Sequence, residues 1–145
     1  MVYEVAMFKP NWIRTAIVVL LATTACFAQS PSDGLIDAAK TWLKNINAGA
    51  RAELLASTDE KFIATTPAGD VLLRERLIPS DTSQSVQTLP LMELDGPISR
   101  VVGETGIVMS RLKPSSGPTL NATFVFVRQQ SAWKLVAIHF SPTGR

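Results

Sequence analysis

His139 is the only histidine of the chain, and its imidazole is the side chain whose ordinary pKa lies nearest to neutral pH. An imidazole beside a bound molecule could act as a general acid or base. Proton transfer of this kind is usually supported by a carboxylate, but the residues alone do not say which carboxylate lies near His139. Two interpretations follow, a catalytic histidine or a hydrogen-bonded structural one.

Asp59 and Glu60 are neighbouring carboxylates ahead of the first expected strand, where they could serve a site or simply form a cap or a solvated turn. A metal site with a single histidine would need two or three carboxylates. The sequence has one cysteine, and it contains neither a phosphate-binding loop nor the Gly-x-Ser-x-Gly pattern of hydrolases. We therefore predict no metal and no cofactor.

The elements that would position these residues are helices first and strands afterwards, in one domain. Apolar residues at helical spacing from Leu35 to Ile46 predict a helix that ends at Gly49, and Arg51 to Ser57 predicts a second. Short turns between the later apolar runs predict antiparallel hairpins, with Asp95-Gly96-Pro97 as one of the turns. The remaining expected elements are Lys61 to Thr66, Val71 to Leu73, a helical turn from Arg74 to Ile78, and strands at Val86 to Leu94, Ile98 to Val102, Gly106 to Leu112, Leu120 to Val127 and Trp133 to Phe140.

Composition narrows the class of protein. The 145 residues carry 14 Lys and Arg against 12 Asp and Glu, so the net charge is +2, too balanced for an electrostatic nucleic-acid binder. Hydrophobic residues make up 46%, which excludes a wholly disordered chain.

The N-terminal residues are typical of a secretory signal peptide. Lys9 and Arg14 precede an uncharged apolar run, and small residues follow it up to Ala28. We predict a signal peptide over 1–28, cleavage after Ala28, and a secreted or periplasmic domain over 29–145. The protein would then meet a membrane only through its signal segment.

Two alternatives concern the same segment. Lipidation of Cys26 would make the protein a lipoprotein, although Thr23 stands where such signals usually have Leu. Translation could begin at Met7 instead of Met1, which would remove Glu4 from the basic region.

The order of motifs resembles the nuclear transport factor 2-like superfamily, and within it the SnoaL-like branch that includes the domain of unknown function 4440. The resemblance covers about Gly34 to Ser141. It rests on the following segments: Trp42-Leu43-x-x-Ile46-Asn47-Ala48-Gly49, Phe62-Ile63, Thr66-Pro67-Ala68-Gly69, Arg100 to Val108, Phe124-x-Phe126-Val127-Arg128, and Trp133 to His139.

The resemblance implies an α+β fold, a cone-shaped curved antiparallel sheet with about three N-terminal helices packed on its concave side. Members include isomerases, dehydratases and domains without known activity, and many are dimers, so the fold does not select a function. Ala50 departs from the family, which often has Asp there, and an alanine cannot cap the second helix.

The resemblance also suggests a site. Alternation along the last strand places His139 on one face with Trp133, Leu135 and Ala137. In relatives a histidine there borders the pocket, and Asp59 is the nominal carboxylate for a dehydratase-like pair. Large apolar side chains are expected in the core, with a minority lining the pocket; the candidates are Trp42, Phe62, Met92 and Met109.

The sequence thus predicts an exported domain that binds a small apolar molecule or a protein partner through the cone pocket. The alternatives are a lyase or isomerase that uses His139 with an acidic residue, and a purely structural domain. Ketosteroid-isomerase chemistry is disfavoured because the only tyrosine, Tyr3, lies in the predicted signal peptide. The strand around Val125 is apolar on both faces, which predicts a homodimer.

Overall fold

The computed structural model describes residues 33–87 and 89–144. The predicted signal peptide therefore lies outside the described residues. The described part forms three helices and one six-stranded sheet, in the order β2-β1-β6-β5-β4-β3. The elements are α1 Asp33–Ala48, α2 Arg51–Ser57, β1 Thr58–Thr65, β2 Val71–Leu73, α3 Arg74–Leu77, β3 Met92–Val102, β4 Thr105–Pro114, β5 Leu120–Gln129 and β6 Ala132–Pro142.

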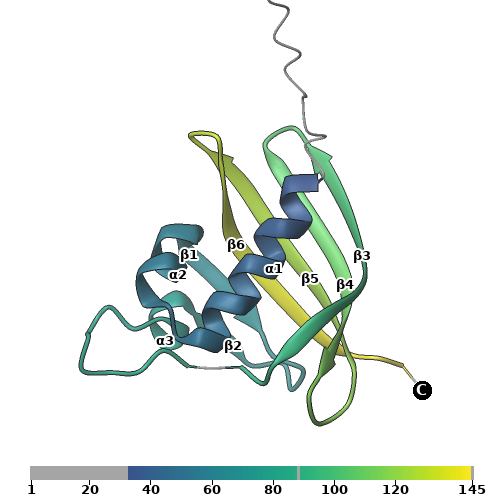
Figure 1. The fold of residues 1–145 in the computed structure, drawn as a ribbon, viewed down its shortest axis with the longest axis horizontal. Coiled ribbons are helices and arrows are strands. Elements are labelled where there is room, and N and C mark those ends of the chain that lie inside the picture. The colour runs from purple at the N-terminus through teal and green to yellow at the C-terminus, as the bar shows by residue number, and fades with distance from the viewer. Residues whose placement is uncertain (1–32, 88, 145) are drawn as a thin grey trace, which may run out of the picture.

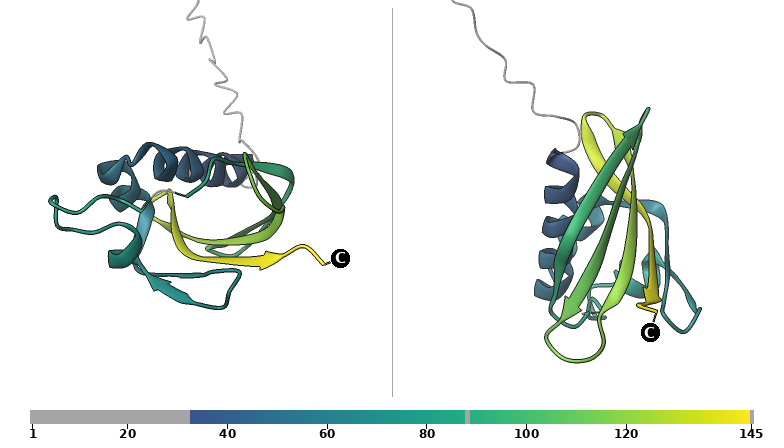
Figure 2. Two further views of the ribbon diagram at one scale, coloured as in Figure 1. Left: turned by 90° about the horizontal axis from the view of Figure 1, so that it is seen from below. Right: turned by 90° about the vertical axis from the view of Figure 1, so that its right-hand side faces the viewer.

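The sheet curls around α1, which runs across its concave side (Figure 1), and the view from below in Figure 2 shows the curvature. This is the predicted α+β cone. Neighbouring strands are antiparallel except β1 and β6, which run parallel.

Helix α1 forms because its apolar residues fall on one stripe, and that stripe is buried against the sheet. The helix ends where predicted. Gly49 has a φ of +63°, its N–H donates to Ile46 at 3.3 Å, and the N–H of Ala50 donates to Asn45 at 3.0 Å. These two bonds form a Schellman cap, which only a residue tolerant of positive φ allows at low cost.

Helix α1 approaches β4 closely over Gly106. An added Cβ there would lie 2.6 Å from Leu35 Cδ1 and 3.2 Å from the Trp133 ring. Leu35 is fully buried, so the missing side chain of Gly106 is what lets the helix reach the sheet.

The region around β3 corrects two predictions. Asp95-Gly96-Pro97 is not a turn: the strand continues through it, and its register with β4 shifts between Asp95 and Ile98. Gly96, with a φ of +61°, takes up the irregularity, so residues suited to a turn here form a bulge. The strand predicted from Val86 begins only at Met92.

Candidate functional site

A cavity of about 360 Å³ lies at one end of the cone. Its floor includes Trp42 from α1, and its walls come from α3, β1, β2, β6, the ends of β3, β4 and β5, and the loops next to those ends. It is lined by fifteen residues: Trp42, Ala64, Thr66, Pro67, Leu72, Leu77, Leu89, Pro90, Met92, Pro114, Ser116, Pro118, Leu120, Ile138 and Phe140.

The cavity lining is almost entirely apolar. Among the described lining residues none has an ionisable side chain, and only Thr66 and Ser116 carry hydroxyls. Among the described lining residues, the one other side-chain hydrogen-bonding group is the indole N–H of Trp42, and it donates to Thr58 Oγ1 at 2.9 Å in the buried interior. The arrangement suits an apolar body that forms few hydrogen bonds.

Four of the lining residues are prolines at the solvent-exposed edge of the cavity, which we call the rim: Pro67, Pro90, Pro114 and Pro118. A proline has no backbone N–H to donate. Thr66 lies beside them in the turn between β1 and β2. Its hydroxyl accepts from the Asp70 N–H at 3.1 Å and lies 3.5 Å from Asp70 Oδ2. A carboxylate therefore stands at this part of the rim.

The segment between α3 and β3 supplies Leu89 and Pro90 to the cavity. Arg51 on α2 forms hydrogen bonds with this segment. The guanidinium donates to the carbonyl of Asp81 at 2.8 Å and to the carbonyls of Pro79 and Gln84. A planar group with several fixed donors can serve several carbonyls at once.

His139 lies outside this cavity, which differs from the prediction. Leu135 pairs with Phe126, but Ala137 pairs with Val125, so Val136 is an extra residue in β6. A bulge of one residue moves every later side chain to the opposite face. Leu135 and Ile138 both point inward as a result, and His139 is exposed on the outer face between Thr123 and Thr65.

Asp59 lies near the start of β1, whereas His139 pairs with Thr65 at the end of the same strand. Its Oδ1 accepts from the Lys61 N–H at 2.8 Å and its Oδ2 from the Gln129 amide at 2.9 Å. These bonds, first the backbone N–H and then the amide, lower the pKa of Asp59 below its usual value of 3.8. Thr65 pairs with His139, six positions along β1 or roughly 20 Å away, so the structure does not bring the two together.

The four apolar residues predicted for the pocket lie in different places. Trp42 and Met92 line the cavity. Phe62 lies in the core, 1% exposed, with its ring 6.1 Å from that of Trp42. Met109 is 50% exposed on the outer face of β4.

Sequence reasoning missed most of the lining. Leu72, Ile138 and Phe140 line the cavity because they occupy the inward-facing positions of β2 and β6. The bulge at Val136 left no local signal, since neither glycine nor proline marks it. The four rim prolines were the available signal, because all stand at strand ends or turns.

The outer face of the sheet carries a different mixture of side chains. Several of its apolar residues are exposed: Ile63, Val71, Leu73, Ile98, Val102 and Met109.

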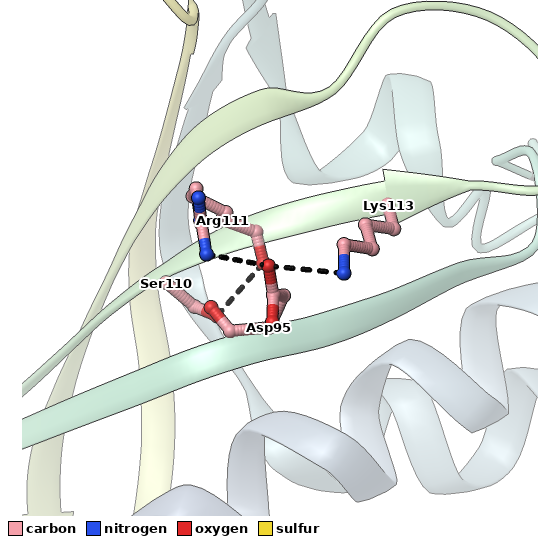
Figure 3. A network of polar contacts seen from close by, with 4 residues as sticks. All are labelled: Asp95, Ser110, Arg111 and Lys113. Carbon is pink, nitrogen blue, oxygen red and sulfur yellow. Dashed lines mark hydrogen bonds and ion pairs between the residues drawn. The ribbon is translucent and has the colours of Figure 1, made fainter.

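Figure 3 shows a charged cluster on this face beside the β3 bulge. Asp95 Oδ2 lies 2.8 Å from Arg111 Nη2 and 3.2 Å from Lys113 Nζ, and Ser110 Oγ donates to the Asp95 carbonyl at 3.1 Å. The cluster ties the bulge to β4.

A second hollow lies on another part of the molecule. An open groove of about 650 Å³ lies between α1 and β3, with Lys40 and Lys44 at its edge. Within residues 33–87 and 89–144 no group of three His, Cys, Asp or Glu side chains could hold a metal ion. In the same residues no helix is long and apolar enough to cross a membrane.

Comparison with known proteins identifies the fold. No protein-family model matches the chain, and no curated protein matches it. Among solved structures, an NTF2-like protein from Cytophaga hutchinsonii has a TM-score of 0.69 at 17% identity and covers 79% of this chain and 100% of its own.

Two further structures have different roles in their names. A proposed ketosteroid isomerase from Parabacteroides distasonis has a TM-score of 0.61 at 18% identity, with 82% of this chain and 92% of that chain covered. The CaMKII hub of S. rosetta also has a TM-score of 0.61 at 18% identity, with 79% and 98% covered. The chain therefore has the NTF2-like fold, which hosts both enzymes and assembly domains.

Proposed function

We propose that this protein binds a small apolar molecule in the cavity at the end of the cone. The observation that carries the proposal is the lining, which is apolar, enclosed on one side by Trp42 and free of ionisable side chains among its described residues. A volume of about 360 Å³ falls within the range of small-molecule sites. We also propose, from the sequence motifs, that this chain belongs to the SnoaL-like branch.

The alternative is a lyase or isomerase, suggested by names among the structural neighbours. Such an enzyme needs a proton-transfer group within reach of the bound molecule. His139 and Asp59 lie away from the lining, and the hydroxyls of Thr66 and Ser116 are the polar side chains that the lining offers. We therefore favour binding over catalysis.

The test is to extract the purified protein with organic solvent and identify the released molecules by mass spectrometry. Titration with the uncharged dye Nile red then measures binding directly. Ala64→Leu places three more carbons into the cavity and should weaken dye binding at least tenfold. Ile63→Leu, the next residue on the opposite face, is the matched control and should leave binding unchanged.

His139→Ala separates the two functions. The binding proposal expects dye affinity to stay within a factor of two, because His139 lies on the outer face. A large loss of affinity in His139→Ala, or equal binding by wild type and Ala64→Leu, would count against the cavity as the site.

We also propose that two copies of the chain associate through the outer face of the sheet. Exposed apolar side chains on adjacent strands, such as Ile98 on β3 and Met109 on β4, favour such a contact. CaMKII hub and association domains among the neighbours lend support to assembly by this fold.

Light scattering at tens of micromolar tests the association. Met109→Lys should convert a dimer to a monomer, whereas Leu91→Lys, exposed to a similar degree but outside the sheet, should not. A wild-type protein that is monomeric at this concentration would contradict the proposed dimer.

Export remains a proposal from the sequence alone. N-terminal sequencing of the protein recovered from its native host should begin at Gln29 if Ala28 is the cleavage site. A lipid-modified Cys26 at the N-terminus would favour the lipoprotein instead.

A further inference from the structure

We infer that the cavity selects an uncharged ligand and rejects carboxylates of the same shape. This inference rests on the proposed binding function and specifies its ligand class. It follows from two observations: the indole of Trp42 and the hydroxyl of Thr66 already form hydrogen bonds within the protein, and a carboxylate lies at the rim.

The interior offers nothing that would stabilise a charge. The Trp42 N–H, the donor nearest the floor, is bonded to Thr58 Oγ1 and cannot serve a ligand without breaking a buried hydrogen bond. The other interior positions, such as Leu77, Ile138 and Phe140, are apolar. An ionised group placed there would lose its hydration and gain no partner.

The rim disfavours an anion as well. The Thr66 hydroxyl accepts from the backbone N–H of Asp70 at 3.1 Å and donates to Asp70 Oδ2 at 3.5 Å, and Asp70 adds its own carboxylate to this part of the rim. The rim prolines supply no N–H groups to hold a carboxylate. The cations of the nearby strand, Arg111 and Lys113, are turned to the outer face, where they pair with Asp95 (Figure 3).

A ligand group that needs a hydrogen bond therefore finds it at the mouth rather than inside. Ser116 is exposed there and carries a hydroxyl that can both donate and accept. A compact apolar ring with one neutral polar group fits this distribution.

Three compounds with one ring system and different charge test the inference by calorimetry: 2-naphthalenemethanol, 2-naphthoate and 2-naphthylmethylammonium. We expect the alcohol to bind at least tenfold more tightly than either ion at pH 7. Equal or tighter binding of the carboxylate, or of the ammonium, would overturn the inference while leaving the cavity as the site. If none of the three binds, the proposed binding function fails and the inference fails with it.

Two variants make the test directional. Leu72 is half-buried and lines the cavity, so Leu72→Lys adds a cation that should raise naphthoate affinity at least tenfold. Leu73→Lys, its outward-facing neighbour, is the matched control and should change nothing.

Asp70→Asn covers the case in which Leu72→Lys does not fold. It removes the rim carboxylate at an exposed turn and should narrow the ratio of alcohol to naphthoate affinity by about threefold, through tighter binding of naphthoate. An unchanged ratio in Asp70→Asn together with unchanged naphthoate binding in a folded Leu72→Lys would contradict the inference.

Discussion

The inner and outer faces of the sheet differ in how deeply their side chains are buried. On β5, Ala122, Phe124 and Phe126 face α1 and are buried, whereas Thr123 and Val125 between them are only partly covered. The inner side determines the fold and the cavity, because its side chains must fill a shared space. The outer side tolerates charges, exposed methionine and the only histidine, so it is free to serve contacts with other molecules.

The largest expected effect tests this difference on one strand. Phe124→Ala should lower the free energy of unfolding by about 3–5 kcal/mol, because it leaves a cavity among fully buried side chains. Thr123→Ala, one residue away on the outer face, should change it by less than about 0.5 kcal/mol. Urea unfolding of both variants measures the contrast, and similar losses would mean that the outer face is packed too.

A second variant tests how tightly the inner side is packed. Gly106→Ala should destabilise the protein by about 1–3 kcal/mol, because the new methyl group meets Leu35. Gly34→Ala, whose Cβ would meet nothing within 4 Å, should instead stabilise helix α1 by about 0.5–1 kcal/mol. Partial rescue of Gly106→Ala by Leu35→Val would identify the contact; equal effects of the two glycine substitutions would contradict it.

A smaller gain is expected away from both faces, at the start of α2. Ala50 precedes the helix and forms no side-chain cap. Ala50→Asp should raise stability by about 1 kcal/mol by accepting a hydrogen bond from the first turn. Ala52→Asp, within the helix, serves as the control for the added charge, and an equal gain there would point to charge rather than capping.

The smallest effect concerns Asp59 at the end of the sheet. Its pKa is lower in the folded protein than in the unfolded chain, so it contributes stability above the usual value of 3.8, and this contribution is lost as pH falls through the folded-state pKa. Asp59→Ala should therefore be less stable than wild type by under about 1 kcal/mol at pH 7. Thermal unfolding across pH 2–7 should show the two curves converge in acid, and a constant offset would assign the loss to packing.

Much of the fold could be predicted from the sequence because its signals are local. The apolar stripe of α1, the glycine that ends it and the bounds of α2 at Arg51 and Ser57 all follow from spacing and residue type. The sheet edge was harder: Asp95-Gly96-Pro97 has the residues of a turn, but pairing along β4 and the ion pairs of Asp95 favour a bulged, continuous strand.

The site could be predicted far less well, because one extra residue determined it. Alternation from Leu135 placed His139 inward, and Val136 reversed that assignment without any local marker. The register of β6 depends on its partners β5 and β1, which are distant in sequence. Cavity residues such as Leu72 and Leu89 come from separate segments, so spacing along the chain could not gather them.

The position of Trp42 gives the protein an internal optical reporter. Its indole is 1% exposed, fixed by Thr58, and forms part of the cavity floor, so its emission should be blue-shifted and should change in intensity when a ligand touches the ring. Trp133 stacks against Arg128, with 4.6 Å from the guanidinium carbon to the ring centre, at the hairpin between β5 and β6. In Trp133→Phe, Trp42 would be the one tryptophan left among the described residues, so the fluorescence would report mainly on the ring that lines the cavity.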